Sequence, residues 1–411
     1  MIKRVFFLLG LSLCGTAVVV ALGVGLSPSF SFTDLTDLTS SVFFVDSVTA
    51  AGLKDLYRSA GQGNERLKVL IVPGHDSESW GTEFRGVKEA QMTAVVGEEL
   101  ARLLSSDPRL SVTLARTSQG YIPEFQTYFQ NERGAVQAFV AEKRKLMQDL
   151  LQEGSVEPVV GVKHNTAASA VVWRLYSFNK WANDNGVDLV IHIHFNDYPG
   201  RPFDRPGRYD GFALYVPEAQ FSNAKASRAV AESLFTQFSQ FYAESNLPKE
   251  ASGIVPDQTL IAIGAYNTLD AASVLIEYGY IYEDRFLNAS VREEFLKELA
   301  FQTTLGLNHF FGAFSEAFRR YPTSFLPHDF DEPLSSGVRH NSSVLALQTA
   351  LTIEHLYPPE GKSKHDCPLT GSFGPCTTEA VKSFQEKYDL APATGVAGEL
   401  TVSKLNVLYS R

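Results

Sequence analysis

Cysteine is scarce in this sequence, with three in 411 residues. Three cysteines cannot build a disulfide scaffold or a thiolate zinc cluster, so any metal site has to use histidine and carboxylate ligands. A basic excess is also lacking: 36 Lys and Arg residues face 46 Asp and Glu residues, for a formal net charge of −10. This balance excludes a nucleic-acid binder, which normally shows a basic face. The length and the 44% of hydrophobic residues predict two domains with buried cores and some appendages.

An uncharged apolar stretch occupies residues 5–26, directly after two basic residues. As a helix rising about 1.5 Å per residue, it is long enough to cross a hydrocarbon core of about 30 Å. The basic end would stay in the cytoplasm, and everything downstream would be exported. We favour an uncleaved membrane anchor over a cleaved signal peptide, because the apolar core is long and no small-x-small exit site is clear. Cys14 would then lie among lipid tails, whereas Cys367 and Cys376 would reach an oxidising compartment that permits a disulfide.

Apolar runs alternate with helical periodicity between residues 66 and 312. The runs predict five strands, at 67–72, 110–114, 188–194, 212–216 and 273–277. Helical spacing predicts helices between them, among them 92–104, 222–245 and 291–312. This alternation predicts an α/β fold with an open, mainly parallel sheet covered by helices on both faces. Outside this domain we expect a spacer at 27–65 with one short helix, a linker at 313–340, and a compact all-α domain of three small helices at 341–411.

Polar side chains follow three of the strands at their carboxyl ends, where ligands collect in open α/β sheets. His75 follows the first strand, His194 ends the third, and Glu277 ends the fifth. Glu89 lies near the start of the first helix, whose amino end points to the same edge. Two histidines and a glutamate suit zinc with an open position for water, and the remaining carboxylate can act as the base. His192 shares a strand face with His194, and we interpret it as a hydrogen-bonded neighbour rather than a ligand.

Each of these residues also has an ordinary structural interpretation. A histidine after Pro-Gly can cap a turn, and a glutamate in the first turn of a helix is favoured by the helix dipole. Glu277 follows an apolar strand, so a structural role for it would require a buried partner such as Arg174 or Arg285. The four positions together are far more specific than any one of them.

In their order and spacing these motifs resemble the zinc-dependent N-acetylmuramoyl-L-alanine amidases of the type 3 group. The resemblance covers roughly residues 67–312 and rests on residues 71–75, Glu89, 193–196 and 274–279, with Arg174, Asn179 and the strand at 211–216 as secondary markers. It implies one zinc ion bound by His75, Glu89 and His194, with Glu277 as the catalytic carboxylate. The implied reaction is hydrolysis of the amide that joins N-acetylmuramic acid to the first L-alanine of a peptidoglycan stem peptide.

The chain departs from this family in two places. The loop after His75, usually rich in glycine, is polar and bulky at residues 76–80, so its substrate contacts are in doubt. The distance between the two histidine motifs is also longer than the short members need, with the excess at about 120–170. We favour a peripheral amphipathic helix packed on the sheet for this insert. The sharper hypothesis is a flap that controls access to the zinc site.

The tail resembles the peptidoglycan-binding domain type 1, across about residues 341–408. The motifs that carry this resemblance are Gly-x-Phe-Gly at 371–374, Thr-x-x-Ala-Val-x-x-Phe-Gln at 377–385, and Gly-x-x-Gly-x-x-Thr at 395–401. An insertion at 354–370 departs from the family pattern and carries Cys367. A disulfide from Cys367 to Cys376 would staple this insertion to the start of the following helix.

The leading interpretation is therefore a membrane-anchored cell-wall amidase of the periplasm or wall, with peptidoglycan as its partner. Two alternatives stay open. One is a catalytically silent protein that binds peptidoglycan or activates a partner, although such proteins normally lose a ligand or the base. The other is a zinc peptidase that cleaves within the stem peptide, which the ligand set alone does not exclude.

Overall fold

The computed structural model describes residues 47–63, 65–162, 169–198, 200–263, 270–313 and 320–410. The expected membrane segment at 5–26 lies outside these residues. Within them, no helix is both long and apolar enough to span a bilayer. All of the described elements belong to one compact unit, Asp46–Arg411.

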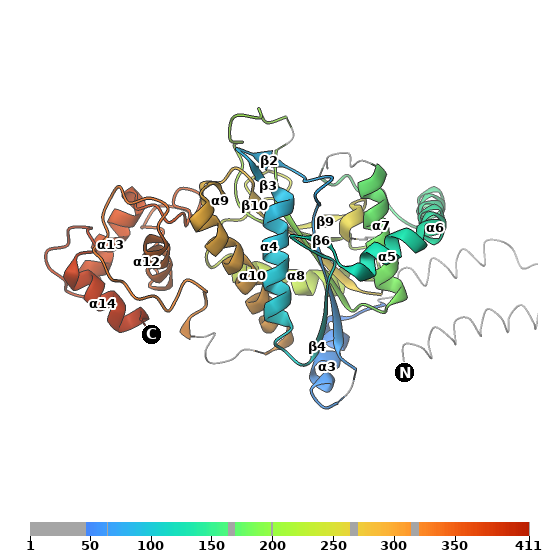
Figure 1. Ribbon diagram of the computed structural model, residues 1–411, viewed down its shortest axis with the longest axis horizontal. Coiled ribbons are helices and arrows are strands. Elements are labelled where there is room, and N and C mark those ends of the chain that lie inside the picture. Colours follow the sequence, from blue (N-terminus) through green and yellow to red (C-terminus); the bar gives the residue numbers. More distant parts are fainter. Residues whose placement is uncertain are drawn as a thin grey trace, which may run out of the picture. The chain divides into compact units, whose positions relative to one another are not determined.

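A six-stranded sheet organises the larger part of this unit (Figure 1). Its strand order is β4 (Leu110–Leu114), β1 (Leu67–Pro73), β7 (Leu189–Asn196), β10 (Ala272–Tyr280), β8 (Ala213–Pro217) and β9 (Ile254–Asp257). The first four strands are parallel, β8 runs antiparallel to β10, and β9 is parallel to β8. The mainly parallel sheet confirms the predicted fold class. The sequence did not predict β9, which is four residues long and contains Pro256; proline is tolerated there because β9 is an edge strand.

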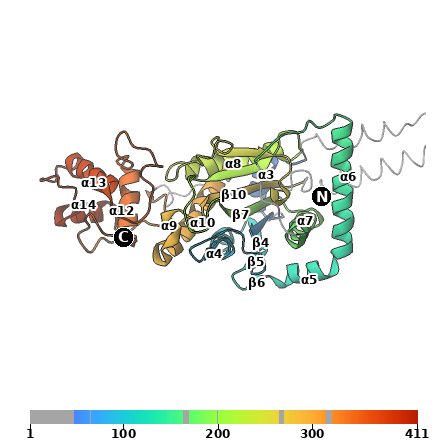
Figure 2. The same ribbon diagram turned by 90° about the horizontal axis from the view of Figure 1, so that it is seen from above.

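Helices cover both faces of the sheet (Figure 2). They are α3 (Ala50–Ala60), α4 (Glu89–Leu104), α8 (Ala224–Phe238) and α10 (Ala289–Phe311) on one face, and α5 (Pro123–Asn131) and α7 (Ser169–Asp184) on the other. The short helices η1 (Ile261–Ile263) and α9 (Asp284–Leu287) flank β10. Val69 and Ile71 of β1 join the core of the first face, and Leu70 and Val72 join that of the second. Successive strand side chains point to opposite faces, so a sheet covered twice produces the continuous apolar runs seen in the sequence.

Two short hairpins, which the sequence did not predict, lie on either side of α4 in the chain. One is β2 (Glu83–Phe84) with β3 (Val87–Lys88), and the other is β5 (Arg116–Thr117) with β6 (Gly120–Tyr121). Strands of two residues are too short to show a period of two. Both hairpins nevertheless carry residues that matter for the site described below.

The insert at about 120–170 forms α5 and α6 (Arg133–Gln152), and α6 lies beside α7 (Figure 2). Val136, Met147 and Leu150 are buried, whereas Leu151 is exposed. The helix is thus peripheral, but it packs on α7 rather than directly on the sheet.

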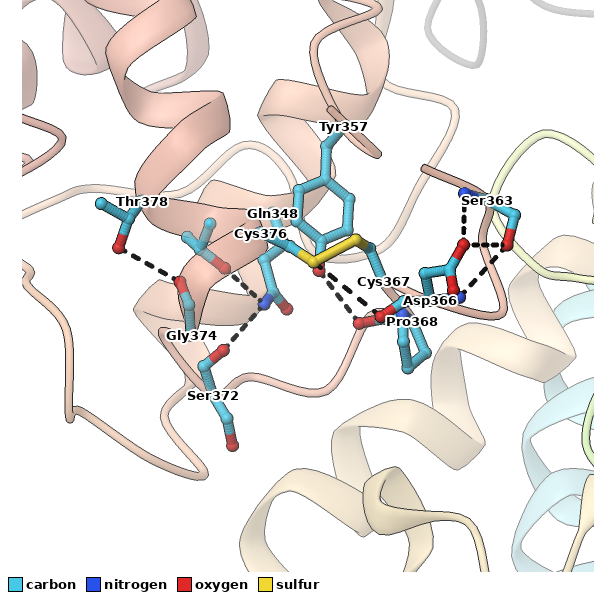
Figure 3. The surroundings of a disulfide bond; sticks show 11 residues. Gln348, Tyr357, Ser363, Asp366, Cys367, Pro368, Ser372, Gly374, Cys376 and Thr378 are labelled. Atoms are coloured by element: carbon cyan, nitrogen blue, oxygen red, sulfur yellow. Dashed lines mark hydrogen bonds between the residues drawn. A yellow bond between two sulfur atoms is a disulfide. The ribbon is translucent and has the colours of Figure 1, made fainter. Parts of the chain in front are cut away.

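The C-terminal region contains the three expected helices, α12 (Ser342–Ile353), α13 (Pro375–Lys387) and α14 (Glu399–Tyr409). Their apolar faces share a core, and two buried glutamines explain the polar positions of the motif. The Gln348 amide donates to Ser372 O and to Thr377 Oγ1, each at 3.0 Å (Figure 3). The Gln385 amide donates in the same way to Val396 O and Thr401 Oγ1. These bonds connect the loops to the helices, so the spacing between each glutamine and its threonine partner is set by the fold.

The structure joins Cys367 to Cys376 in a disulfide (Figure 3). Cys367 is buried, and Tyr357 donates a hydrogen bond to the carbonyl of the next residue, Pro368, at 3.1 Å. The bond connects the insertion at 354–370 to the first turn of α13.

The segment before α12, expected to be a linker, makes specific contacts with α10. Buried Glu298 accepts hydrogen bonds from Thr323 Oγ1 at 2.8 Å, from the Ser324 backbone N–H at 2.6 Å and from the Ser324 hydroxyl. Gln302, one turn further along α10, also donates to Glu298 at 2.6 Å. Burial raises the pKa of Glu298 to about 7, against the opposing effect of these donors.

Candidate active site

Strand pairing brings the predicted site residues to one edge of the sheet. β7 pairs in parallel with both β1 and β10, so the carboxyl ends of all three strands are neighbours. His75 follows β1, and His194 lies directly opposite Glu277 in the β7–β10 register. Glu89 is the first residue of α4.

Three of these side chains form a compact cluster. His75 Nε2 lies 3.2 Å from Glu89 Oε2, and His194 Nδ1 lies 3.0 Å from Glu89 Oε1. The two imidazole rings meet edge to face, with centroids 5.2 Å apart. One possible ligand atom from each residue lies within 4.8 Å of the others, a group that could hold a metal ion.

The backbone around the cluster is shaped for close approach. His75 has a φ of 63°, a left-handed conformation that is uncommon for a residue other than glycine and costs of order 1–3 kcal/mol. A Cβ at Gly74 would collide with the His194 ring, and one at Gly81 would collide with Glu89 and His75. A side chain at either glycine would therefore push the three candidate ligands apart.

Glu89 is buried and held from several sides. The backbone N–H groups of Thr82 and Phe195 donate to its carboxylate at 3.0 and 3.1 Å. Burial alone would raise the pKa of Glu89, but the nearby His75 and His194 rings and the Thr82 N–H hold it at about 2. Burial lowers the pKa of His75. An ionised carboxylate beside a neutral imidazole is the protonation state that metal ligands require.

Glu277 lies beside the cluster with no ion-pair partner among the described residues. Its Oε2 atom is buried and accepts no hydrogen bond from them. Burial raises the pKa of Glu277 well above its usual value, and the nearby Glu89 and Glu250 carboxylates raise it further. The two structural partners considered from the sequence pair elsewhere, Arg174 with Asp76 and Glu78, and Arg285 with Glu283. Ion pairing with either arginine therefore does not explain this carboxylate.

The expectation for His192 was wrong in one respect. Its side chain is fully buried behind His194, but neither ring nitrogen has a hydrogen-bond partner in the described part of the chain. Burial, together with the nearby His194, lowers the pKa of His192 to about 3. The ring therefore packs as a neutral, apolar group.

Arg116, which the sequence did not single out, connects the loops that carry the candidate ligands. Its buried guanidinium donates to Pro73 O at 3.1 Å and to Gly74 O at 2.6 Å, next to His75. It also reaches Ala90 O at 3.0 Å and Thr93 Oγ1 at 2.7 Å on the first turns of α4, next to Glu89. The only hint in the sequence is an arginine two residues after the β4 run.

A second supporting group is Glu250, also not anticipated. This buried carboxylate accepts from Asn196 Nδ2 at 2.9 Å, Tyr215 OH at 2.5 Å, Ser245 Oγ at 2.5 Å and Tyr280 OH at 3.0 Å. It thereby fixes Asn196, the last residue of the histidine motif on β7, relative to the end of β10.

The secondary markers lie close to the site. Arg174 of α7 pairs with Asp76, which follows His75 and also accepts from Tyr121 OH at 2.8 Å. Burial tends to raise the pKa of Asp76, but these contacts and two backbone N–H donors keep it below the usual range. Asn179 donates to Ile261 O at 2.9 Å and connects α7 to the segment before β10.

Several solved structures are similar over the sheet domain. The N-acetylmuramoyl-L-alanine amidase from Clostridium difficile 630 is 15% identical, with a TM-score of 0.38, and the match covers 61% of this chain and 100% of that chain. The CwlD amidase from Clostridioides difficile, in complex with the GerS lipoprotein, is 12% identical, with a TM-score of 0.39 and the same coverage. The amidase Ami1 from Mycobacterium smegmatis is 15% identical, with a TM-score of 0.37, covering 60% and 98%. No curated protein matches the chain.

Family comparison gives two matches along the chain. Residues 69–309 match the N-acetylmuramoyl-L-alanine amidase family, and residues 340–405 match the peptidoglycan binding domain. The first match covers more than half of the chain and includes all four predicted site residues. The chain therefore belongs to the N-acetylmuramoyl-L-alanine amidase family of cell-wall hydrolases and carries a C-terminal peptidoglycan-binding domain.

Proposed function

We propose that this protein is a zinc amidase that cleaves the bond between N-acetylmuramic acid and L-alanine in peptidoglycan. The single observation that supports this most strongly is the His75, Glu89 and His194 cluster, in which three ligand atoms converge beside Glu277. Two imidazoles and one carboxylate form a donor set typical of catalytic zinc, which keeps an open position for water. The low pKa of the Glu89 carboxylate favours a bound cation.

When bound at such a site, zinc lowers the pKa of water from 15.7 to about 7 and polarises the carbonyl oxygen of an amide. The residues of the chain supply the remaining steps. Glu277 accepts a proton from the attacking water as the water oxygen bonds to the amide carbon. It then gives the proton to the alanine nitrogen as the carbon–nitrogen bond breaks, so a carboxylic acid and a free amine leave the site.

The setting of Glu277 suits this double role. A carboxylate fully exposed to water would be a weak base, because its pKa would be about 4.3. Burial and the neighbouring carboxylates raise the pKa of Glu277. A bound cation would lower the pKa of Glu277 again by stabilising its ionised form. The two opposing effects would let the same carboxylate accept a proton from water and return it to the amide nitrogen.

The remaining parts of the chain fit a wall enzyme. The C-terminal domain would hold the enzyme on its polymeric substrate, which raises the local concentration of cleavable bonds. The apolar residues 5–26 would export the chain and, if uncleaved, anchor it in the membrane.

One experiment tests the reaction and the residue roles together. Purified residues 47–411 would be incubated with peptidoglycan, and the fragments analysed by mass spectrometry, with a chelator and Glu277→Gln as controls. We expect stem peptides with free L-alanine amino termini from the zinc-loaded protein only, and a loss of at least about 100-fold in Glu277→Gln. Cleavage within the stem would instead identify a peptidase, and zinc binding without cleavage would identify a silent binding protein.

A further inference from the structure

The loop and hairpin between His75 and Glu89 present an exposed tryptophan beside a lysine. Trp80 is 42% exposed, an unusual state for so large an apolar side chain, and Lys88 places its ammonium 4.1 Å from the centre of the indole ring. Such a cation–π contact restricts the motion of the lysine side chain.

Both residues adjoin the candidate metal ligands. Lys88 directly precedes Glu89, and Trp80 directly precedes Gly81, whose Cα lies against Glu89 and His75. The Trp80 carbonyl accepts the Ala90 N–H at 3.0 Å, which joins the loop to the first turn of α4. The pair therefore borders the loop and the helix that carry the candidate ligands.

The hairpin that carries Lys88, and the loop before it, are held by residues that follow β7. Thr82 donates to Asp197 at 2.5 Å, and Arg201 donates to the Glu83 carbonyl at 3.1 Å. Arg201 also lies over the Phe84 ring, 4.9 Å from its centre. A surface held this firmly loses little conformational entropy when a ligand binds.

Lys88 has no carboxylate partner within ion-pair distance among the described residues. Glu83 lies opposite it in the hairpin register but forms no ion pair with it. A positioned ammonium without a counter-charge, beside an exposed aromatic face, is complementary to a ligand that carries a carboxylate next to apolar groups. Stem peptides of peptidoglycan have this character, because they combine free carboxylates with alanine methyl groups.

We propose that Trp80 and Lys88 form a subsite for the stem peptide, in which Lys88 binds a stem carboxylate and Trp80 positions the ammonium and packs against the peptide. The proposal rests on the amidase function proposed above and concerns the peptide side of its substrate. It also accounts for the bulky loop that replaces the glycine-rich loop of the family.

The test measures binding to a zinc-loaded Glu277→Gln protein, which does not consume the ligand. The probes are a muramyl tripeptide with free stem carboxylates and the same peptide with those carboxylates amidated. The free form should bind about 5-fold more tightly, the size expected for one partly exposed ion pair. Adding Lys88→Gln should bring the ratio of the two dissociation constants to about one, and Lys88→Arg should restore part of the preference.

Trp80 gives an independent readout, because the chain contains only three tryptophans. Ligand binding should change the intrinsic fluorescence, and Trp80→Phe should remove most of that change. Lys297→Gln, on an exposed lysine that pairs with Glu293 on α10, serves as the matched control and should keep the preference. Zinc content, measured for every variant, should be unchanged.

The outcomes separate the two proposals. If Lys88→Gln keeps the preference, or weakens both peptides equally, the residue only supports the loop and the subsite is refuted. If active protein with Lys88→Gln cleaves the free muramyl peptide with an unchanged KM, the subsite is also refuted while the amidase function stands. If the unsubstituted protein releases no stem peptides with L-alanine amino termini, the amidase function itself fails.

Discussion

Replacing Arg116 by lysine should lower both the zinc affinity of the site and the stability of the metal-free protein. The guanidinium reaches the carbonyls of Pro73 and Gly74 beside one candidate ligand and of Ala90 beside another. A lysine keeps the positive charge but has no equivalent of the Nε–H that donates to Pro73 O. Its ammonium also lies one bond nearer the backbone than Nη2, the nitrogen that donates to both Gly74 O and Ala90 O. The loop carrying His75 and the helix carrying Glu89 would then no longer be fixed to each other.

The magnitudes can be estimated from these contacts. One or two buried acceptors would lose their donor, at about 1–3 kcal/mol each, so the metal-free protein should lose about 2–4 kcal/mol of stability. That is tolerable for a protein with an ordinary stability of about 5–15 kcal/mol. Loss of a group that orients metal ligands typically costs about 10- to 100-fold in metal affinity, and we expect a loss in this range.

The assay is competition for zinc between the protein and a chromophoric chelator, with urea unfolding of the metal-free protein measured in parallel. Arg285 provides the control, because it is equally buried but pairs with Glu283 at 2.7 Å and contacts no candidate ligand. Arg285→Lys should lower the stability and leave the zinc affinity within about 2-fold. If Arg116→Lys binds zinc as tightly as the unsubstituted protein, the guanidinium does not position the ligands and the reasoning fails.

Three further predictions concern the rest of the fold. Burial raises the pKa of Glu298 from 4.5 to about 7, so the folded state keeps this proton up to a higher pH than the unfolded state does. The free energy of unfolding should therefore fall by about 3 kcal/mol as the pH rises from about 4.5 to 7. In Glu298→Gln, the free energy of unfolding measured across this range should depend less on pH. Mass mapping of exported protein should find Cys367 linked to Cys376, and two free thiols there would contradict the pairing. Deletion of α6, residues 133–152, should leave a folded protein without raised activity on cell walls; a rise would support an inhibitory flap instead.

The sheet was predictable where strands are buried on both faces. Residues 69–72 form a continuous apolar run because alternate side chains pack against helices on opposite sides. The edge strand β9 and the two-residue hairpins lack such a run, since most of their stabilisation comes from neighbours distant in sequence. For the insert, helical periodicity predicted α6 correctly. It could not predict that α6 packs on α7 rather than on the sheet.

The candidate site also contains residues that a local sequence pattern predicts and residues that it does not. His75, His194 and Glu277 each end or follow a strand, so a local pattern and the rule that strand ends meet were enough to predict their convergence. Arg116 and Glu250 act across separations of 43 and 54 residues, on backbone carbonyls and on an amide that carry no pattern of their own. Nothing local distinguishes them from other charged residues, because their function depends on which segments the fold places around them.

This division has a consequence for how the site tolerates substitution. A histidine ligand can be replaced with little effect on the fold, since His75 and His194 contact Glu89 only through their side chains, whereas Glu89 also accepts the backbone N–H groups of Thr82 and Phe195. Arg116 and Glu250 instead bond several buried groups at once, so removing either breaks several hydrogen bonds together. Substitutions at the motif residues should therefore abolish activity in a folded protein, whereas substitutions at the unpredicted residues should reduce stability and metal affinity together. The residues that a motif search overlooks are those on which the geometry of the motif depends.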